Sequence, residues 1–457
     1  MTGTTTIEAE LGRFYAGRRL ILIGHPLSAY ARQSGVLRRM GAPEPFVVAD
    51  GTGSGLVPEG IAGHHVVSLG RSGARGRALS RLLTAPPRDL RTTLDAYDRD
   101  RTALVVAETP GCPAEFDGRP VTDAGTRWGA AFADHRALDA LWSRRGITVL
   151  PSAVVAPEPR LLEEAHLAQD LGYGTVARAV GNPLAPEANG PAHRLRAPRD
   201  AVAAARRLAA VCRVVRVMPH VPGTPCGIGG FVLPEGPVLL RPHEEIVLEA
   251  RGALLSAGCS GHWVPGDPAR RSLEDTALAV GAELRERHGY RGAFQLSGLL
   301  VGDGFLPWEL GLRTGAGHAL FEGGQPNLST ALLHAALVAG HDLRVSTAAF
   351  AALVDAGGSA NAVISLDAPA PPEAGATRTL WLARDADGLH TVARGGRSNA
   401  CLLHTTVGDT GRLLLVAGPE FAAARGQHGA RLGQSVAQVC QLAAEHWEMD
   451  LPLETAW

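Results

Sequence analysis

The most informative segment of this sequence is a predicted β-hairpin over residues 293–313. Glu309, Ser297 and Arg313 lie on it or at its end, and they offer a carboxylate, a hydroxyl and a guanidinium group. A carboxylate can bind a divalent cation and an arginine can bind a phosphate, although polar residues on a strand are also typical of a solvated face. The chemistry of this candidate site depends on which of these side chains share a face.

The register of the hairpin follows from its apolar residues. Asp303-Gly304 indicates a turn. Apolar residues alternate on both strands, and they are Phe294, Leu296, Leu300, Leu306, Trp308, Leu310 and Leu312. The two apolar sets must lie on one face, which a two-residue loop at Asp303-Gly304 does not allow. We therefore predict a three-residue loop, Gly302–Gly304, which pairs Val301 with Phe305 and places Ser297 opposite Glu309, with Gly311 beside them.

The chain has 457 residues and contains no lysine, so all 44 basic residues are arginine. This excludes P-loop NTPases, which need the Walker A lysine, and enzymes that form a Schiff base through lysine. Any phosphate that a cationic side chain holds must be held by Arg or His. The 45 acidic residues bring the net charge to −1, and this balance gives no indication of a nucleic-acid partner.

The six cysteines are scattered and form no C-x-x-C pair, which favours a reducing cytoplasm over a zinc site or a disulfide framework. Hydrophobic residues make up 45% of the chain and charged residues 19%, which is typical of a globular protein with an ample core. No apolar stretch approaches the roughly 18 residues that a membrane span requires, and no signal peptide is predicted.

Residues 1–150 alternate short apolar runs with helical patterns. The runs predicted as buried strands are Arg19–Gly24, Pro45–Asp50, His65–Leu69, Ala103–Ala107 and Ile147–Leu150. Helices are predicted over Ala29–Met40, Arg77–Leu83 and Gly129–Arg145. This alternation predicts an α/β domain with a doubly wound parallel sheet. The dinucleotide fingerprint G-x-G-x-x-G is absent after Gly24, so dinucleotide binding has little support.

Prolines at positions 151, 157 and 159 mark a boundary, beyond which the pattern changes. Helices are predicted over Leu161–Leu171, Arg199–Cys212, Glu274–His288, Leu328–Val338 and Ala422–Trp447. Strands are predicted over Thr175–Val180, Arg213–Met218, Gly230–Leu233, Pro237–Arg241, Thr379–Leu382 and Arg412–Ala417. A loop rich in Gly, Pro and Asn, Gly181–Pro191, lies between the first two of these strands.

The run Glu309-x-Gly-x-Arg313 resembles the E-x-N-x-R strand of the ATP-grasp superfamily, and its surroundings resemble the ATP-grasp peptide ligases of the pheganomycin type. The matching segments are Val215–Cys226, Leu240–Glu244, Gly292–Gly298, Asp303–Pro307 and Glu309–Gly317. The resemblance implies a pre-ATP-grasp α/β domain (1–150), a two-lobed ATP-grasp fold (151–235 and 236–340) and a C-terminal α+β extension (341–457).

The resemblance also implies an ATP-dependent ligase that joins a small-molecule carboxylate and an amine through an acyl phosphate, in bacterial secondary metabolism. ATP and Mg²⁺ are the implied cofactors, and a homodimer is compatible with the sequence. By the family pattern, Arg313 is the expected catalytic residue and Glu309 the expected metal ligand. The expected nucleotide-binding residues are Arg178, Val217, Met218, His220 and Arg241.

The sequence departs from the family at the metal site. The positions of the family's Asp and Asn ligands hold Ser297 and Gly311, and Arg178 is the best substitute for the nucleotide-facing lysine. Three hypotheses therefore stay open: an active amide ligase, a degenerate ATP-grasp fold that binds a substrate or a partner protein, and an ATP-independent enzyme. Binding of Mg·ATP would separate the first two.

Overall fold

The computed structural model describes residues 3–53, 56–67, 82–107, 113–122, 128, 132, 135–180, 192–325, 327–357, 362–368, 377–385, 388–393, 396, 398, 400–407, 410–417, 421, 431–449 and 453–457. The predicted loop Gly181–Pro191, most of the predicted helix Arg77–Leu83 and the start of the predicted helix Ala422–Trp447 lie outside these residues. Among the helices in the described ranges, none combines the length and the apolar composition that crossing a bilayer requires.

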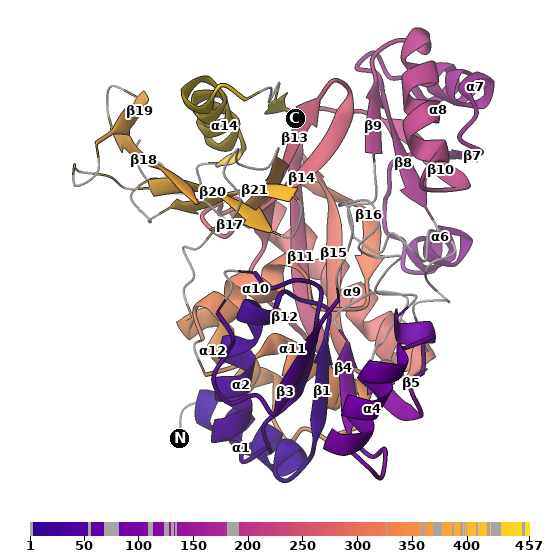
Figure 1. Cartoon of the computed structure of the whole chain (residues 1–457). Coiled ribbons are helices and arrows are strands. Elements are labelled where there is room, and N and C mark those ends of the chain that lie inside the picture. Colours follow the sequence, from indigo (N-terminus) through magenta and orange to yellow (C-terminus); the bar gives the residue numbers. More distant parts are fainter. Residues whose placement is uncertain are drawn as a thin grey trace.

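The N-terminal part of the chain forms a six-stranded sheet in the order β3-β2-β1-β4-β6-β5. Figure 1 shows this part in indigo and purple, with β1, β3, β4 and β5 labelled. Its strands are β1 (Leu20–Ile23), β2 (Phe46–Ala49), β3 (Gly63–Val66), β4 (Leu104–Ala107), β5 (Glu115–Phe116) and β6 (Arg119–Thr122). All neighbours are parallel except β5 and β6. The helical elements are α1 (Gly3–Tyr15), η1 (Leu27–Ala29), α2 (Tyr30–Arg39), α4 (Arg88–Tyr97) and α6 (His135–Arg144).

Strands β1, β2 and β4 are buried along their whole length, as their continuous apolar runs predict. Alternate residues enter two separate cores, with Leu20 and Leu22 in one and Ile21 and Ile23 in the other. The sheet is therefore covered on both faces, and the predicted doubly wound α/β domain is confirmed.

The predicted strand Ile147–Leu150 is wrong. These residues form no strand, and the first strand after α6 is β7 (Ala153–Val155), which joins a different sheet. Ile147 and Val149 instead pack against the core beneath β15, so their apolar pattern reflects packing without strand pairing.

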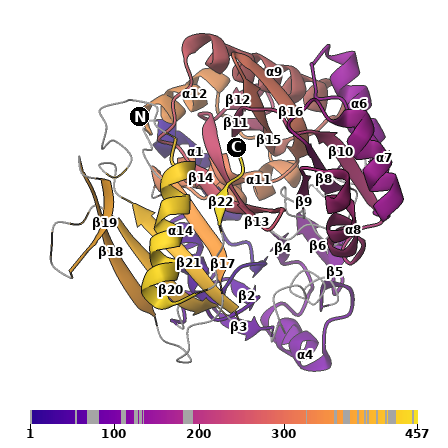
Figure 2. The same ribbon diagram turned by 90° about the horizontal axis from the view of Figure 1, so that it is seen from above.

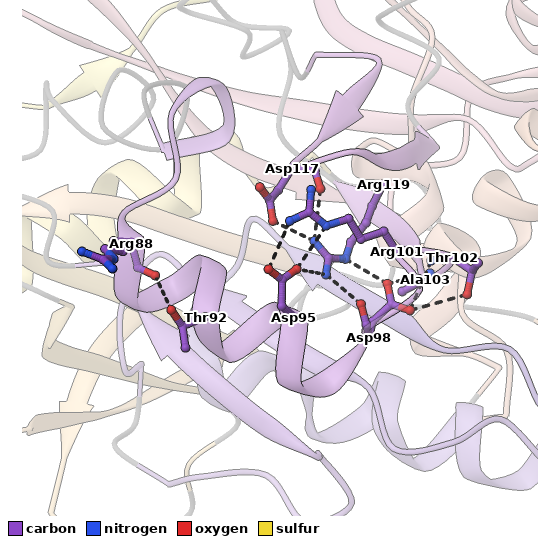
Figure 3. A network of polar contacts seen from close by, with 9 residues as sticks. All are labelled: Arg88, Thr92, Asp95, Asp98, Arg101, Thr102, Ala103, Asp117 and Arg119. Carbon is purple, nitrogen blue, oxygen red and sulfur yellow. Dashed lines mark hydrogen bonds and ion pairs between the residues drawn. The ribbon is translucent and has the colours of Figure 1, made fainter.

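One polar network fastens the edge of the N-terminal sheet (Figure 3). Arg119, at the start of β6, has no exposed surface, and its guanidinium group donates to the carboxylates of Asp98, Asp117 and Asp95. Asp98 is also fully buried and accepts N–H groups from Thr102 and Ala103. The network joins the end of α4 to β6 and leaves Asp98 well satisfied.

A small lobe over residues 153–219 packs two helices against an antiparallel sheet. Its elements are β7, α7 (Pro159–Gln169), β8 (Thr175–Val180), β9 (Ala192–Leu195), η4 (Pro198–Asp200), α8 (Ala201–Ala209) and β10 (Val214–Pro219). Strand β10 pairs with β7 and β8, and β9 continues the sheet into the next lobe by pairing with β14.

A large lobe over residues 224–356 carries the hairpin. Its strands are β11 (Thr224–Val232), β12 (Pro237–Leu239), β13 (His243–Ala250), β14 (Ala253–Ser260), β15 (Gly292–Val301) and β16 (Gly304–Gly311). Its helices are α9 (Asp267–His288), α10 (Ala316–Gly323), α11 (Thr330–Val338) and α12 (Thr347–Ala356). Strands β13 and β14 were not predicted from the sequence, and they carry part of the candidate site.

The C-terminal extension adds a second antiparallel group to the sheet of the large lobe (Figure 2). Its elements are β17 (Ala362–Ala368), β18 (Arg378–Asp385), β19 (Gly388–Val392), β20 (Ala400–Val407), β21 (Thr410–Ala417), α14 (Gly433–Trp447) and β22 (Glu454–Thr455). Strand β17 pairs with β14, and β22 pairs with β13. The buried carboxylate of Glu244 on β13 accepts the N–H groups of Leu432 and Gly433 at the start of α14. The extension is therefore attached to β13 at two points.

The predicted three-residue loop of the hairpin is wrong. Val301 pairs with Gly304, so the loop is Gly302-Asp303. Gly302 has a φ of 59°, the left-handed conformation that glycine adopts in such short hairpin loops without steric cost.

A β-bulge nevertheless restores the predicted pairing of polar residues. The register shifts where Trp308 is the extra residue, and beyond the shift Ser297 lies opposite Glu309. The predicted core face of this strand is wrong before the bulge. Trp308 turns toward the cleft between the lobes, whereas Phe305 and Leu310 pack in the core.

Candidate active site

The cleft-facing side of the large lobe changes from apolar to polar along two strands. Alternate residues of a strand share a face, and on β15 this series is Leu299, Ser297 and Gln295. On β13 it is Val247, Glu245 and His243, and the two strands run parallel because both are antiparallel to β11. The cleft is therefore apolar at one end and lined by polar and ionisable groups at the other.

A cavity that opens to solvent lies at the apolar end, between the two lobes, and its empty space, with the open solvent included, is about 570 Å³. It is lined by Leu150, Val176, Arg178, Ala192, Met218, Pro219, Val247, Leu254, Ser256, Leu299, Trp308 and Trp457. Met218 and Pro219, at the end of β10, lie at the joint between the lobes, where the sequence predicted nucleotide contacts. Val217 differs, because its side chain is buried in the core of the small lobe.

Two tryptophan side chains, Trp308 and Trp457, line one side of this cavity, and His220 supports Trp457 from outside the lining residues. The rings of Trp457 and His220 are stacked at 5.1 Å with 18° between their planes, and Trp308 lies 6.1 Å from Trp457. His220 donates from Nε2 to the carbonyl oxygen of Ala456 at 3.1 Å, and the Ala456 N–H donates to Val247. Trp457 was not predicted as a site residue, and only the long-range pairing of β22 with β13 brings it here.

Arg178 and Glu309 meet across the cleft. Arg178 extends from β8 of the small lobe and forms an ion pair with Glu309 on β16 of the large lobe. Its guanidinium carbon also lies 6.0 Å from the centre of the Trp308 ring. Burial raises the pKa of Glu309, while the positive charges of Arg178 and Arg313 act to lower it. The structure thus brings together three of the residues predicted from the hairpin resemblance.

A second carboxylate, Glu245, lies beside this pair and was missed by the sequence analysis. The Ser297 hydroxyl donates to Glu245 Oε1. Burial raises the pKa of Glu245 to about 7, and the charge of Glu309 adds to the rise against the lowering effects of Ser297 and Arg178. The alternation of His243, Glu245 and Val247 is the sequence signal that indicates β13 and this face.

A neutral histidine, His243, lies at the polar end of the cleft. Burial lowers the pKa of His243 to about 4, and its Nε2 accepts from Gln295 Nε2 at 3.2 Å. Gly227 lies between them, where a Cβ atom would come within 2.9 Å of both side chains. The missing side chain of Gly227 is what allows this contact.

The remaining predicted residues, Arg313 and Arg241, differ in their distance from this cleft. Arg313 follows β16 and is partly buried, close enough for its charge to act on Glu309. Arg241 is exposed and donates to the carbonyl oxygen of Asp355 at 2.7 Å, and it lines a separate cavity of about 320 Å³ with Gly317 and Phe321. The structure therefore does not bring Arg241 to the cavity that Arg178 lines.

The described residues contain no group of three or more His, Cys, Asp or Glu side chains arranged to hold a metal ion alone. Mg²⁺ commonly uses only one or two carboxylates and takes its other ligands from phosphate and water. Glu309 and Glu245 are carboxylates of that kind, and Glu245 Oε2 is buried with no hydrogen-bond partner in the structure. This donor set fits a cation that arrives with a nucleotide.

No known protein family and no curated protein matches the sequence. Solved structures do match. An N5-carboxyaminoimidazole ribonucleotide synthetase in complex with ADP has a TM-score of 0.51 and 12% identity, covering 95% of this chain and 98% of that one. A biotin carboxylase–β,γ-ATP complex from Campylobacter jejuni has a TM-score of 0.52 and 13% identity, with 87% coverage of both chains.

An L-amino acid ligase from Bacillus licheniformis is similar over 97% of this chain and 99% of its own, with a TM-score of 0.51 and 11% identity. Identities this low show a shared fold and leave the reaction open. The chain has the fold of the ATP-grasp ligases, and the predicted fold class is confirmed.

Proposed function

We propose that this protein is an ATP-dependent carboxylate–amine ligase that forms an amide, peptide-like bond through an acyl phosphate. The observation that carries the proposal is the meeting of Arg178 and Glu309 from opposite lobes beside a cavity that is lined mainly by apolar residues. A purine base fits an apolar cavity with few polar groups, and its triphosphate would extend toward the charged groups. We also propose that the chain divides after residues 150, 235 and 340 into the α/β domain, the two ATP-grasp lobes and the C-terminal extension.

In this reaction a substrate carboxylate oxygen attacks the γ-phosphorus of ATP, the bond to ADP breaks, and an amine then displaces phosphate from the acyl phosphate. Arg178 and Arg313 would hold the phosphates and oppose the charge that develops during transfer. Mg²⁺, held by Glu309, would neutralise phosphate charge when the nucleotide is bound. The resemblance over residues 210–320 supports the peptide-like product and a role in bacterial secondary metabolism, and the scattered cysteines support a cytoplasmic location.

One observation favours the degenerate alternative, in which the fold binds a substrate or partner without using ATP. Glu309 is already paired with Arg178, and the neighbouring family positions hold Ser297 and Gly311. Under this alternative, the ion pair is a permanent structural link between the lobes. Under the ligase proposal, bound ATP breaks the Arg178–Glu309 ion pair, because Arg178 then binds the phosphates.

Titration of the full chain with Mg·ATP tests the proposal. Trp308 and Trp457 line the cavity, so their fluorescence should change in a saturable way with ATP, ADP and a non-hydrolysable analogue. ADP should form only when a carboxylate and an amine from an amino-acid pool are both present. No fluorescence change and no heat with any nucleotide would favour the degenerate alternative.

Replacing Trp457 by alanine should weaken ATP binding about tenfold, or ~1.4 kcal/mol, because it removes an aromatic wall of the cavity. Calorimetric titration measures the effect without relying on tryptophan emission. Trp381→Ala, on β18 of the extension, is the matched control and should bind ATP like the parent protein. Equal ATP affinity in all three proteins would show that the base does not contact Trp457.

A further inference from the structure

The proposed Mg·ATP site has one carboxylate on the hairpin where two would be expected. Ser297 lies opposite Glu309, and a neutral hydroxyl is a poorer ligand for Mg²⁺ than a carboxylate. A second carboxylate that reaches the same place from another strand would remove this deficit.

Glu245 reaches that place from β13. Ser297 donates its hydroxyl to Glu245 Oε1, and Ser297 is also the direct cross-strand partner of Glu309. The two carboxylates therefore flank one serine. Strand β11 lies between β13 and β15, and its residue beside Ser297 is Gly227, which has no side chain to separate them.

The second carboxylate oxygen of Glu245, Oε2, gives independent evidence that a ligand binds here. Glu245 is only 7% exposed, and its Oε2 atom is buried with no hydrogen-bond partner in the structure. Leaving a carboxylate oxygen buried without a partner is costly, so such atoms are expected where a ligand supplies the missing contact. Arg178, whose positive charge acts on Glu245, forms an ion pair with Glu309.

We propose that Glu245 supplies the second carboxylate of the metal–nucleotide site, with Ser297 orienting it and Glu309 as the other protein ligand. This inference rests on the proposed function. It assigns Ser297 a positioning role in place of the ligand role of the family's aspartate. It also explains how a site that lacks that aspartate can still hold a divalent cation.

The test compares ATP affinity with and without Mg²⁺ in the parent protein, Glu245→Gln and Glu244→Gln. Glu244 is the matched control, since it is buried on the same strand but holds the start of α14. We expect Mg²⁺ to tighten ATP binding in the parent protein and in Glu244→Gln. In Glu245→Gln, the factor by which Mg²⁺ increases ATP affinity should be about tenfold smaller. Equal Mg²⁺ dependence in all three proteins would overturn the inference and leave the proposed function standing.

Electron paramagnetic resonance of Mn²⁺ bound with ADP gives a second readout that needs no turnover. Glu245→Asp keeps the charge but withdraws the carboxylate by one methylene group, so it covers the case in which Glu245→Gln fails to fold. We expect weaker Mn²⁺ binding in this variant, and unchanged binding would contradict the inference. Failure of the parent protein to bind ATP at all would instead overturn the proposed function, and this inference with it.

Discussion

Replacing Arg119 by methionine should lower the free energy of unfolding by about 3–5 kcal/mol. The guanidinium group donates to Asp98, Asp117 and Asp95 at 2.9, 2.8 and 3.1 Å, and none of its surface is exposed (Figure 3). Methionine occupies a similar volume but leaves Asp98 as a buried carboxylate without a cation. Chemical denaturation of the full chain, followed by circular dichroism, measures the loss.

The loss should depend on pH. Burial acts to raise the pKa of Asp98, but hydrogen bonds from Ala103, Arg119 and Thr102 outweigh it and hold the pKa below its ordinary value of 3.8. A lowered native pKa gives stability above the ordinary pKa, and this stability is lost as the pH falls through the native pKa. The deficit of Arg119→Met should therefore be largest near neutral pH and shrink below about pH 4.

Arg101→Met is the control for this prediction. Arg101 donates to the same Asp95 at 3.1 Å, but it is solvent-exposed, so its loss should barely move the unfolding midpoint. If both variants unfold at the midpoint of the parent protein, the buried network contributes nothing to stability and its assignment is wrong.

The N-terminal sheet could be predicted from sequence because its signals are local. Strands β1, β2 and β4 are short β-branched runs bounded by turns, and each is buried on both faces. Residues 147–150 have the same composition and form no strand. Local composition reports that a segment is buried, but whether it pairs with another strand depends on neighbours that are distant in sequence.

The hairpin shows how a wrong prediction of a loop can leave the predicted pairing of two residues correct. A three-residue loop and a two-residue loop followed by a one-residue bulge give the same pairing of Ser297 with Glu309. The alternation of apolar residues determined how the two strands pair at the end away from the loop. It did not reveal whether the one extra residue lies in the loop or in the strand. The choice decides which side chains between the loop and the bulge face the core: Phe305 is there in place of the predicted Leu306, and the bulge turns Trp308 into the cavity.

Glu245 and Trp457 could not be found from the hairpin motif because they come from other parts of the chain. Glu245 is 52 residues from Ser297 in sequence, and the strand that carries it was not predicted. Trp457 reaches the cavity only because β22 pairs with β13. Both depend on β13, which connects the large lobe, the extension and the cleft.

Replacing Arg313 by alanine should lower kcat about 100- to 1000-fold and change ATP affinity much less, if the protein is the proposed ligase. Arg313 follows β16, and its positive charge already acts on the pKa of Glu309. A guanidinium group fixed at the end of a strand needs little reorganisation when negative charge develops on the transferring phosphoryl group. That charge is larger in the transition state than in bound ATP, so the loss should appear in kcat.

Steady-state ADP release and calorimetric ATP binding, measured on the same preparations, separate the two effects. Arg271→Ala, on the exposed side of α9, is the control, and it should keep both kcat and the Kd for ATP. Arg313→Lys should recover only part of the rate, because an ammonium group cannot make the paired contacts of a guanidinium group. An Arg313→Ala protein with parental turnover would remove Arg313 from the transfer step. A protein that lost ATP affinity and kept kcat would show that Arg313 binds the ground state and does not stabilise the transition state.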